Sequence, residues 1–174
     1  MVSELSRRRK FNLLIKHLAP KSHVLEVGTG DGWFATRLRA CGHVTVTIDL
    51  ECPANIVGDI LNWRSLGLTA KSFDAVVALE VIEHVDCLDA ICDLCKDGGL
   101  ILLSSPHPHW DWAMKILEFL RLTQRRTSAH NNLTNFASIN LVRVVFARPL
   151  FIHQVALFRN THRLSDAGDT YPRA

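Results

Sequence analysis

Short apolar runs, separated by polar or glycine-containing turns, recur along the chain and predict the strands of a sheet. The run at 73–79 is almost wholly apolar, which is typical of a buried strand. Pro106 ends the fifth run, because proline cannot donate to a sheet ladder. We expect strands at 23–28, 44–49, 55–59, 73–80, 100–105 and 150–158.

The longer segments between these runs are interpreted mostly as helices. The first stops at Pro20, and the one before the fifth strand ends at Gly98 and Gly99. Strands that alternate with helices predict an α/β fold, in which helices cover both faces of a mostly parallel sheet. We expect helices near 4–18, 33–40, 87–95, 110–122 and 135–146.

Composition narrows the function only slightly. The chain is 48% hydrophobic and 21% charged, as in an ordinary globular protein. No run of 18 apolar residues predicts a membrane span, and the N-terminus lacks the apolar core of a signal peptide, so we expect a cytoplasmic protein. We interpret Cys92 and Cys95 as buried thiols of a helix, because no second Cys-x-x-Cys completes a metal site.

Charge is distributed unevenly. The net charge is +3, and residues 120–174 hold eight arginines and no lysine, against Asp166 and Asp169. This excess is typical of a solvated face, and the alternative is that it attracts an anionic small molecule. It does not favour nucleic acid as a partner, because aromatic side chains are not interleaved with the arginines.

Three glycines follow the first predicted strand, in "VLEVGTGDGW". Gly28, Gly30 and Gly32 would allow a tight turn and let a ligand approach the backbone closely. Asp49 ends the next strand, where a carboxylate can accept both ribose hydroxyls of a nucleoside. The spacing is G-x-G-x-G, and Trp33 stands where the dinucleotide motif has its last glycine. The loop therefore favours a nucleoside without a pyrophosphate.

Taken in order, these features resemble the class I S-adenosylmethionine-dependent methyltransferases, and within them the type 11 group. The resemblance covers roughly residues 20–160 and rests on "VLEVGTGDG", "TIDL", "VGDI", "FDAVVALEVIEHV" and "GGLILLSSPHP". It implies a Rossmann-like, doubly wound sheet of strand order 3-2-1-4-5, followed by a C-terminal strand or strands. It also implies S-adenosylmethionine as cofactor, S-adenosylhomocysteine as product, and a small-molecule acceptor methylated on oxygen or nitrogen.

The resemblance assigns cofactor binding to residues at the carboxyl ends of the strands. Glu26 and the glycine loop would lie along the methionine part, and Asp49 would hold the ribose. Asp59 would reach the adenine amino group, with Leu50 and Ile60 beside the ring. The residues alone leave open that Asp59 is a helix cap and Glu26 a strand group bonded to backbone amides. The expected cofactor-binding residues are Glu26, Gly28, Thr29, Gly30, Gly32, Asp49, Leu50, Asp59, Ile60, Leu79 and Glu80.

Candidate catalytic groups lie at the ends of the fourth and fifth strands and beyond. A base assists methyl transfer when the acceptor is an oxygen or nitrogen atom. "ALEVIEHVD" supplies two candidates after strand four, and "SSPHPHW" supplies His107 and His109 after strand five. A further histidine lies in a long connection that could fold over a substrate. The expected catalytic residues are His84, Glu83, His107 and His130.

The Glu-x-x-Glu-His string also resembles the motif by which ubiquinone-pathway O-methyltransferases and small-RNA 2′-O-methyltransferases hold a divalent ion. In that alternative Glu80, Glu83, His84 and His130 would coordinate Mg²⁺, which would orient a hydroxyl group and lower its pKa. The same string occurs in type 11 proteins without a metal, where the first Glu faces the cofactor. We therefore expect no metal and keep the Mg²⁺-dependent O-methyltransferase as the alternative.

We expect a single methyltransferase domain over residues 1–174. Class I enzymes usually end in two strands, whereas only one is evident at "LFIHQVALF". The second strand is therefore expected to be missing, or to be supplied by a partner chain in a homodimer formed through the C-terminal sheet edge. The expected parts are an N-terminal helix (1–20), a cofactor-binding core (21–105), substrate-side helices and a lid (106–148), a final strand (149–160) and a polar tail (161–174).

Two other function classes stay open. A nucleotide-cofactor oxidoreductase would share the glycine loop, but it lacks a use for the strand-four motif. A catalytically idle, cofactor-binding scaffold subunit would share every motif. Binding of S-adenosylhomocysteine in preference to NAD separates the first class, and turnover of an acceptor separates the second.

Overall fold

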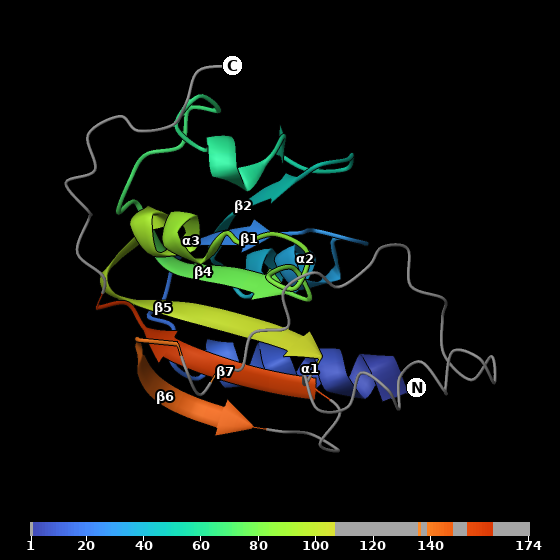
Figure 1. The fold of residues 1–174 in the computed structure, drawn as a ribbon. Coiled ribbons are helices and arrows are strands. Elements are labelled where there is room, and N and C mark those ends of the chain that lie inside the picture. Colours follow the sequence, from blue (N-terminus) through green and yellow to red (C-terminus); the bar gives the residue numbers. More distant parts are fainter. Residues whose placement is uncertain (1, 107–135, 137–138, 148–152, 162–174) are drawn as a thin grey trace, which may run out of the picture.

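The computed structural model describes the chain except for residues 1, 107–135, 137–138, 148–152 and 162–174. The described strands form one seven-stranded sheet of order β3-β2-β1-β4-β5-β7-β6 (Figure 1). The elements are α1 (Val2–Ile15), β1 (His23–Val27), α2 (Trp33–Ala40), β2 (Val44–Asp49), β3 (Ile56–Val57), the 3-10 helix η1 (Ile60–Asn62), β4 (Phe73–Leu79), α3 (Leu88–Leu94), β5 (Cys95–Pro106), β6 (Val142–Ala147) and β7 (His153–Arg159).

Strands β1 to β5 pair in parallel, and β7 runs antiparallel between β5 and β6. This arrangement confirms the predicted Rossmann-like sheet with the order 3-2-1-4-5 and a C-terminal addition. From β1 the chain adds β2 and then β3 on one side, and it then crosses to the other side of β1 to form β4 and β5. The direction in which strands are added to the sheet therefore reverses between β1 and β4. Ligands bind above the carboxyl ends of strands at such a reversal.

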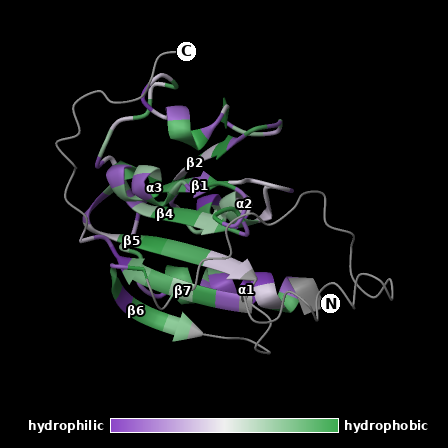
Figure 2. Cartoon of the chain, viewed as in Figure 1, coloured by the Kyte–Doolittle hydropathy of each residue, from purple (hydrophilic) through white to green (hydrophobic). Residues whose placement is uncertain are grey.

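The core forms two layers, one on each face of the sheet. Successive strand residues point to opposite faces, so Val24 packs in one layer and Leu25 in the other. Phe11 of α1 and Leu38 of α2 complete the layer of Val24, whereas Ile91 of α3 completes the layer of Leu25. The central strands are apolar almost throughout (Figure 2), as their burial on both faces requires.

The helix predicted at 135–146 is wrong, because residues 142–147 form strand β6. The run "VRVVFA" holds three β-branched valines, and such residues favour a pleated strand over a helix. The prediction that the chain lacks a second C-terminal strand is also wrong. Strand β6 pairs with β7 within the chain, so a partner chain is not needed to complete the hairpin, and homodimer formation stays a prediction without that premise.

Several predictions fall on residues outside the described part of the chain. They are the helix at 110–122, the lid over most of 106–148, the polar tail beyond 161, and the candidate bases His107, His109 and His130. Among the described helices, none is both long enough and apolar enough to cross a membrane.

Candidate active site

The turn between β1 and α2 is shaped by glycines that a larger residue could not replace. Gly28 has a φ of +75°, and a Cβ atom there would lie 2.4 Å from the Cγ2 atom of Val81, which follows β4. Only glycine therefore allows the β1 turn and the β4 turn to pack this closely. At Gly30, also with positive φ, a Cβ atom would meet nothing within 4 Å, so the backbone there is open to a ligand.

Asp49, the last residue of β2, is tied to this glycine turn. Its Oδ2 atom accepts hydrogen bonds from the amides of Thr29, at 2.7 Å, and Gly30, at 3.3 Å. Its Oδ1 atom receives only a long bond of 3.4 Å, from the amide of Glu51. The carboxylate is half-buried, so Oδ1 keeps the capacity to accept hydroxyl groups. Leu50 beside it is 70% exposed, which leaves an apolar surface for a flat ring.

Glu26 lies within β1 and is buried beneath the same turn. Its Oε2 atom accepts a hydrogen bond of 3.1 Å from the amide of Ala35, near the start of α2. Burial raises the pKa of Glu26 to about 7, more strongly than the Ala35 amide and the charge of Arg39 lower it. Both the backbone bond and contact with the cleft are present, so the two interpretations of Glu26 from sequence are compatible.

Asp59 and Ile60 follow β3, the outer strand that pairs with β2. The Oδ1 atom of Asp59 accepts the amide of Leu61 at 2.9 Å, so Asp59 caps η1 as the alternative from sequence proposed. Its second oxygen is not needed for the cap. Ile60 is buried in the core, whereas Leu61 is 41% exposed and offers more surface to a ligand.

Glu80 follows β4 in a left-handed backbone conformation, with a φ of +58°, which is uncommon for a residue with a side chain. Its Oε1 atom accepts hydrogen bonds from the Nζ atom of Lys10 at 2.8 Å and from the hydroxyl of Ser104 at 2.7 Å. Lys10 also donates to the Ser104 hydroxyl, at 2.9 Å. A buried lysine of α1 thus holds the carboxyl end of β4 against β5.

Glu83 and His84 share a turn after β4 but differ in exposure. The Glu83 side chain is fully buried, and neither carboxyl oxygen has a hydrogen-bond partner of ordinary geometry in the described part of the chain. Burial and then the charge of Glu80 raise the pKa of Glu83 to about 7, while Ser105 and Lys10 oppose the shift less strongly. His84 is exposed. The two residues are adjacent, but only Glu83 lies in a desolvated environment.

A cleft of about 170 Å³ opens at the carboxyl ends of β1 and β4. It brings together the predicted residues Glu26, Gly28, Thr29, Gly30, Leu79 and Glu80. Its other lining residues were missed by the sequence analysis: they are Arg7, Lys10, Asp31, Trp33 and Phe34. The spacing of Arg7 and Lys10 could have indicated a basic surface, because two cations three residues apart share one face of a helix.

The alternative metal site finds no support in the described residues. No three His, Cys, Asp or Glu side chains among them are grouped so that they could hold an ion, and His130 lies outside this part. The ammonium group of Lys10 also lies 2.8 Å from Glu80, where its charge would repel a divalent cation.

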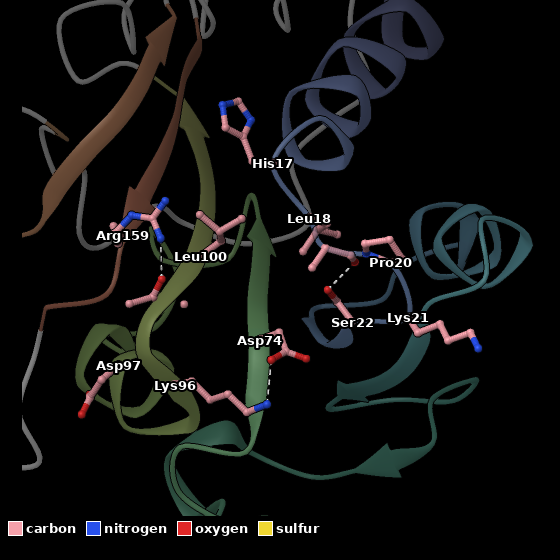
Figure 3. A pocket seen from close by; sticks show the side chains of 13 residues that line it. His17, Leu18, Pro20, Lys21, Ser22, Asp74, Lys96, Asp97, Leu100 and Arg159 are labelled. Atoms are coloured by element: carbon pink, nitrogen blue, oxygen red, sulfur yellow. Dashed lines mark hydrogen bonds and ion pairs between the residues drawn. The ribbon is translucent and has the colours of Figure 1, made fainter.

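A second hollow, of about 400 Å³, lies at the opposite, amino-terminal edge of the sheet (Figure 3). Lys96 donates to Asp74 at 2.6 Å, and Arg159 donates to the carbonyl of Gly98 at 2.8 Å. Lys21 points away from the other labelled side chains. The hollow is larger than the cleft, but its charged groups are largely paired with protein groups and form no recognisable catalytic arrangement.

Comparison with known proteins identifies the family of this chain. The family described as "Methyltransferase domain" matches residues 3–141. A search of curated proteins returns no match. The finer assignment to the type 11 group stays a prediction.

Solved structures with the same fold include methyltransferases of different acceptors. The N-methyltransferase NodS from Bradyrhizobium japonicum WM9 is 20% identical, with a TM-score of 0.62 over 90% of this chain and 97% of that one. Magnesium protoporphyrin IX methyltransferase from Synechocystis PCC 6803, with bound S-adenosylhomocysteine, is 13% identical, with a TM-score of 0.65 over 91% and 83%. The CurJ carbon methyltransferase is 16% identical, with a TM-score of 0.61 over 85% and 51%. With the family match over most of its length, this chain belongs to the class I S-adenosylmethionine-dependent methyltransferases.

Proposed function

We propose that this protein transfers the methyl group of S-adenosylmethionine to an oxygen or nitrogen atom of a small molecule. The bound cofactor would supply an electrophilic methyl group on a sulfonium, a good leaving group. The protein therefore has to align acceptor, methyl and sulfur, and to remove a proton from the acceptor.

The residues at the carboxyl edge suit the cofactor. Asp49 would bind the ribose through its Oδ1 atom, since Oδ2 is already held by the loop amides. Leu50 would lie beside the adenine, and the second oxygen of Asp59 would accept its amino group. Gly30, Glu26 and the remaining cleft residues would surround the methionine part, where the backbone is open.

The burial and the raised pKa of the Glu83 carboxyl group favour an acceptor that reacts through oxygen or nitrogen. Neither oxygen of the buried Glu83 carboxyl group is in a hydrogen bond of ordinary geometry among the described residues, which is costly, and an acceptor O–H or N–H group would supply a well-placed donor. A pKa of about 7 lets the same group take the proton near neutral pH. Glu83 is thus our candidate base, and His84 or a histidine outside the described residues would contact the acceptor.

The test uses S-adenosylmethionine with a labelled methyl group and a panel of small alcohols, phenols and amines. Carbon acids and an RNA serve as comparison acceptors. We expect label in a hydroxyl or amine compound. Glu83→Gln should lower the rate by about 100-fold or more, within the range of general-base effects, and leave the affinity for S-adenosylhomocysteine within about twofold.

The matched control is Asp86→Asn, an exposed acidic residue three positions later, which should keep the rate. Label that enters only the carbon acids or the RNA would contradict the proposed acceptor class. A Glu83→Gln variant with the wild-type rate would remove Glu83 from the mechanism.

A further inference from the structure

Charge is separated between the two sides of the sheet. The first 40 residues, which form α1, β1 and α2, contain eight lysines and arginines against three acidic residues. Residues 49–97 contain three lysines and arginines against ten acidic residues. Helices α1 and α2 both pack in the layer of Val24, whereas α3 packs in the layer of Leu25, on the opposite side. The side covered by α1 and α2 is therefore basic, and the side around α3 is acidic.

The exposed side of α1 carries cations in one stripe. Leu5, Arg9 and Asn12 of α1, and Lys16 directly after it, follow one another at intervals of four, three and four residues. Side chains at this spacing lie along one side of a helix, and all four are exposed. Neither Arg9 nor Lys16 has an ion-pair partner among the described residues. Two cations of this stripe are therefore available to an anion outside the chain.

Helix α2 extends this surface. It lies beside α1, because the ring of Phe11 in α1 contacts the ring of Phe34 in α2, with centroids 5.5 Å apart. Arg37 of α2 is exposed, and its guanidinium lies 5.5 Å from the centroid of the Phe11 ring. This cation–π contact holds Arg37 where the two helices meet and leaves N–H donors at the edge of the guanidinium for an anion. We call Arg9, Lys16 and Arg37 the basic surface.

The side chains around the basic surface favour lipid headgroups over nucleic acid. Proteins bind unpaired nucleic-acid strands by stacking the bases on aromatic side chains. In α1 and α2, however, Phe11 and Phe34 are buried, and the half-buried Trp33 lines the cleft. The apolar side chain in the stripe is Leu5, which is aliphatic and 53% exposed. Such a side chain can enter the boundary between lipid headgroups and acyl chains.

The acidic side of the molecule would fix the orientation on an anionic surface. Asp86 and Asp89, at the start of α3, are exposed, so headgroups that attract the basic surface would repel this side. The cleft at the carboxyl ends of β1 and β4 is lined partly by Arg7 of α1 and Trp33 of α2. A protein docked through these two helices would therefore hold its cleft next to the lipid surface.

We propose that the basic surface of α1 and α2 docks on a membrane that contains anionic lipids, with α3 turned away from it. The contact is peripheral and electrostatic, because the cations attract the headgroups without a membrane-spanning segment. The inference rests on the distribution of charge and does not use the proposed methyl transfer.

The test is co-sedimentation with vesicles. Phosphatidylcholine vesicles that contain about one-third phosphatidylserine are compared with vesicles of phosphatidylcholine alone. We expect wild type to bind the anionic vesicles, and binding to weaken as salt is added. Each Lys or Arg near an anionic surface raises the affinity roughly fivefold, so Arg9→Gln/Lys16→Gln should lower the affinity by about tenfold or more.

The matched control is Arg64→Gln/Lys96→Gln, which lowers the net charge by the same amount. Both residues are exposed cations outside α1 and α2, and they pair with Asp93 and Asp74. This variant should bind the anionic vesicles within about twofold of wild type, because its charges lie away from the basic surface.

Three results would overturn the proposal. The first is a wild-type protein that binds neither kind of vesicle, or both equally. The second is an equal loss in the two double variants, because net charge alone would then explain the binding. The third comes from a single-stranded RNA oligonucleotide titrated in parallel: if Arg9→Gln/Lys16→Gln weakens binding to this RNA more than binding to vesicles, the surface serves nucleic acid. Binding of S-adenosylhomocysteine is measured separately, so the proposed function can fail or hold independently.

Discussion

Charged residues lie at both ends of the parallel strands, which we call the amino-terminal edge and the carboxyl edge of the sheet, but their interactions differ. At the amino-terminal edge, Lys96 pairs with Asp74 and Lys71 pairs with Asp97. Burial alone would raise the pKa of Asp74, but hydrogen bonds from Lys96 and from the amide of His23 outweigh it, and the pKa is lowered. These charges are satisfied by their neighbours.

At the carboxyl edge the acidic groups are less well satisfied. Burial raises the pKa of Glu26 and of Glu83 to about 7. Desolvated acids are concentrated at functional sites. The difference teaches that the size of a hollow is a poor guide here: the larger hollow has exposed ion pairs, whereas desolvated carboxyl groups lie at the carboxyl ends of the strands, at or near the smaller cleft.

Glycine replacement should separate the edges most clearly. Gly28→Ala places a Cβ atom 2.4 Å from Val81 and at a φ of +75°, so we expect a loss of about 3 kcal/mol or more in the free energy of unfolding. Cofactor affinity should fall by more than about tenfold because the turn must shift. Urea unfolding and calorimetry with S-adenosylhomocysteine measure the two effects.

Gly98→Ala is the matched change at the other edge. Its φ is +72°, but a Cβ atom would meet nothing within 4 Å, so the cost should be only about 1–2 kcal/mol, with unchanged cofactor affinity. Equal losses of cofactor affinity in the two variants would erase the distinction between the edges.

The pH dependence of stability tests the buried acid Glu83. Its pKa is about 7 in the folded chain against an ordinary 4.5, so between these values the folded state holds a proton that the unfolded chain has released. The free energy of unfolding therefore falls as the pH rises through this window, by roughly 3 kcal/mol at most from Glu83.

In Glu83→Gln the decrease in the free energy of unfolding that Glu83 causes as the pH rises should be absent. The decrease that Glu26 causes should remain. Urea unfolding at pH 5 and pH 8 measures it, with Asp86→Asn as the exposed control. An unchanged pH dependence in Glu83→Gln would mean that this carboxyl is not desolvated as described.

A smaller contrast is expected between two lysine–carboxylate pairs. Lys10→Met removes a buried cation from Glu80 and Ser104, and should cost about 2 kcal/mol. Lys96→Met breaks a pair whose side chains are 46% and 36% exposed, and should cost less than about 1 kcal/mol. Urea unfolding at neutral pH compares them, and a reversed order would show that α1 is not anchored through Lys10.

The sheet was predictable because its signals are local in the sequence. Apolar runs located β1, β2 and β4 to within a few residues, and the glycine turn indicated the cleft beside β1. Strand β5 begins at Cys95, before the predicted start at residue 100, so Gly98 and Gly99 lie within this strand and do not end the helix as predicted. The strand β6 was not recognised: its three valines favour a strand, but the run is short and has no clear turn signal, so helix and strand both stayed possible. Pairing with β7, which is a tertiary contact, decides between the two.

The features of the site that the sequence did not predict depend on contacts between residues far apart in the sequence. The bond between Lys10 and Glu80 joins residues 70 positions apart, and no local pattern indicates it. The opposite exposure of Glu83 and His84 also depends on how the turn packs, whereas the sequence places them side by side. The types and the order of the residues therefore identified the cofactor class. The ion pair between Lys10 of α1 and Glu80 became evident only from the folded structure.

Calorimetric titration with S-adenosylhomocysteine, in wild type, Asp49→Ala and Asp74→Ala, tests the central claim most directly. Both residues are carboxylates that accept backbone amides, one at each edge of the sheet. We predict that wild type binds this ligand and not NAD, that Asp49→Ala lowers the affinity by about tenfold or more, and that Asp74→Ala leaves it within about twofold. Binding of NAD in preference, or equal losses in the two variants, would contradict the account.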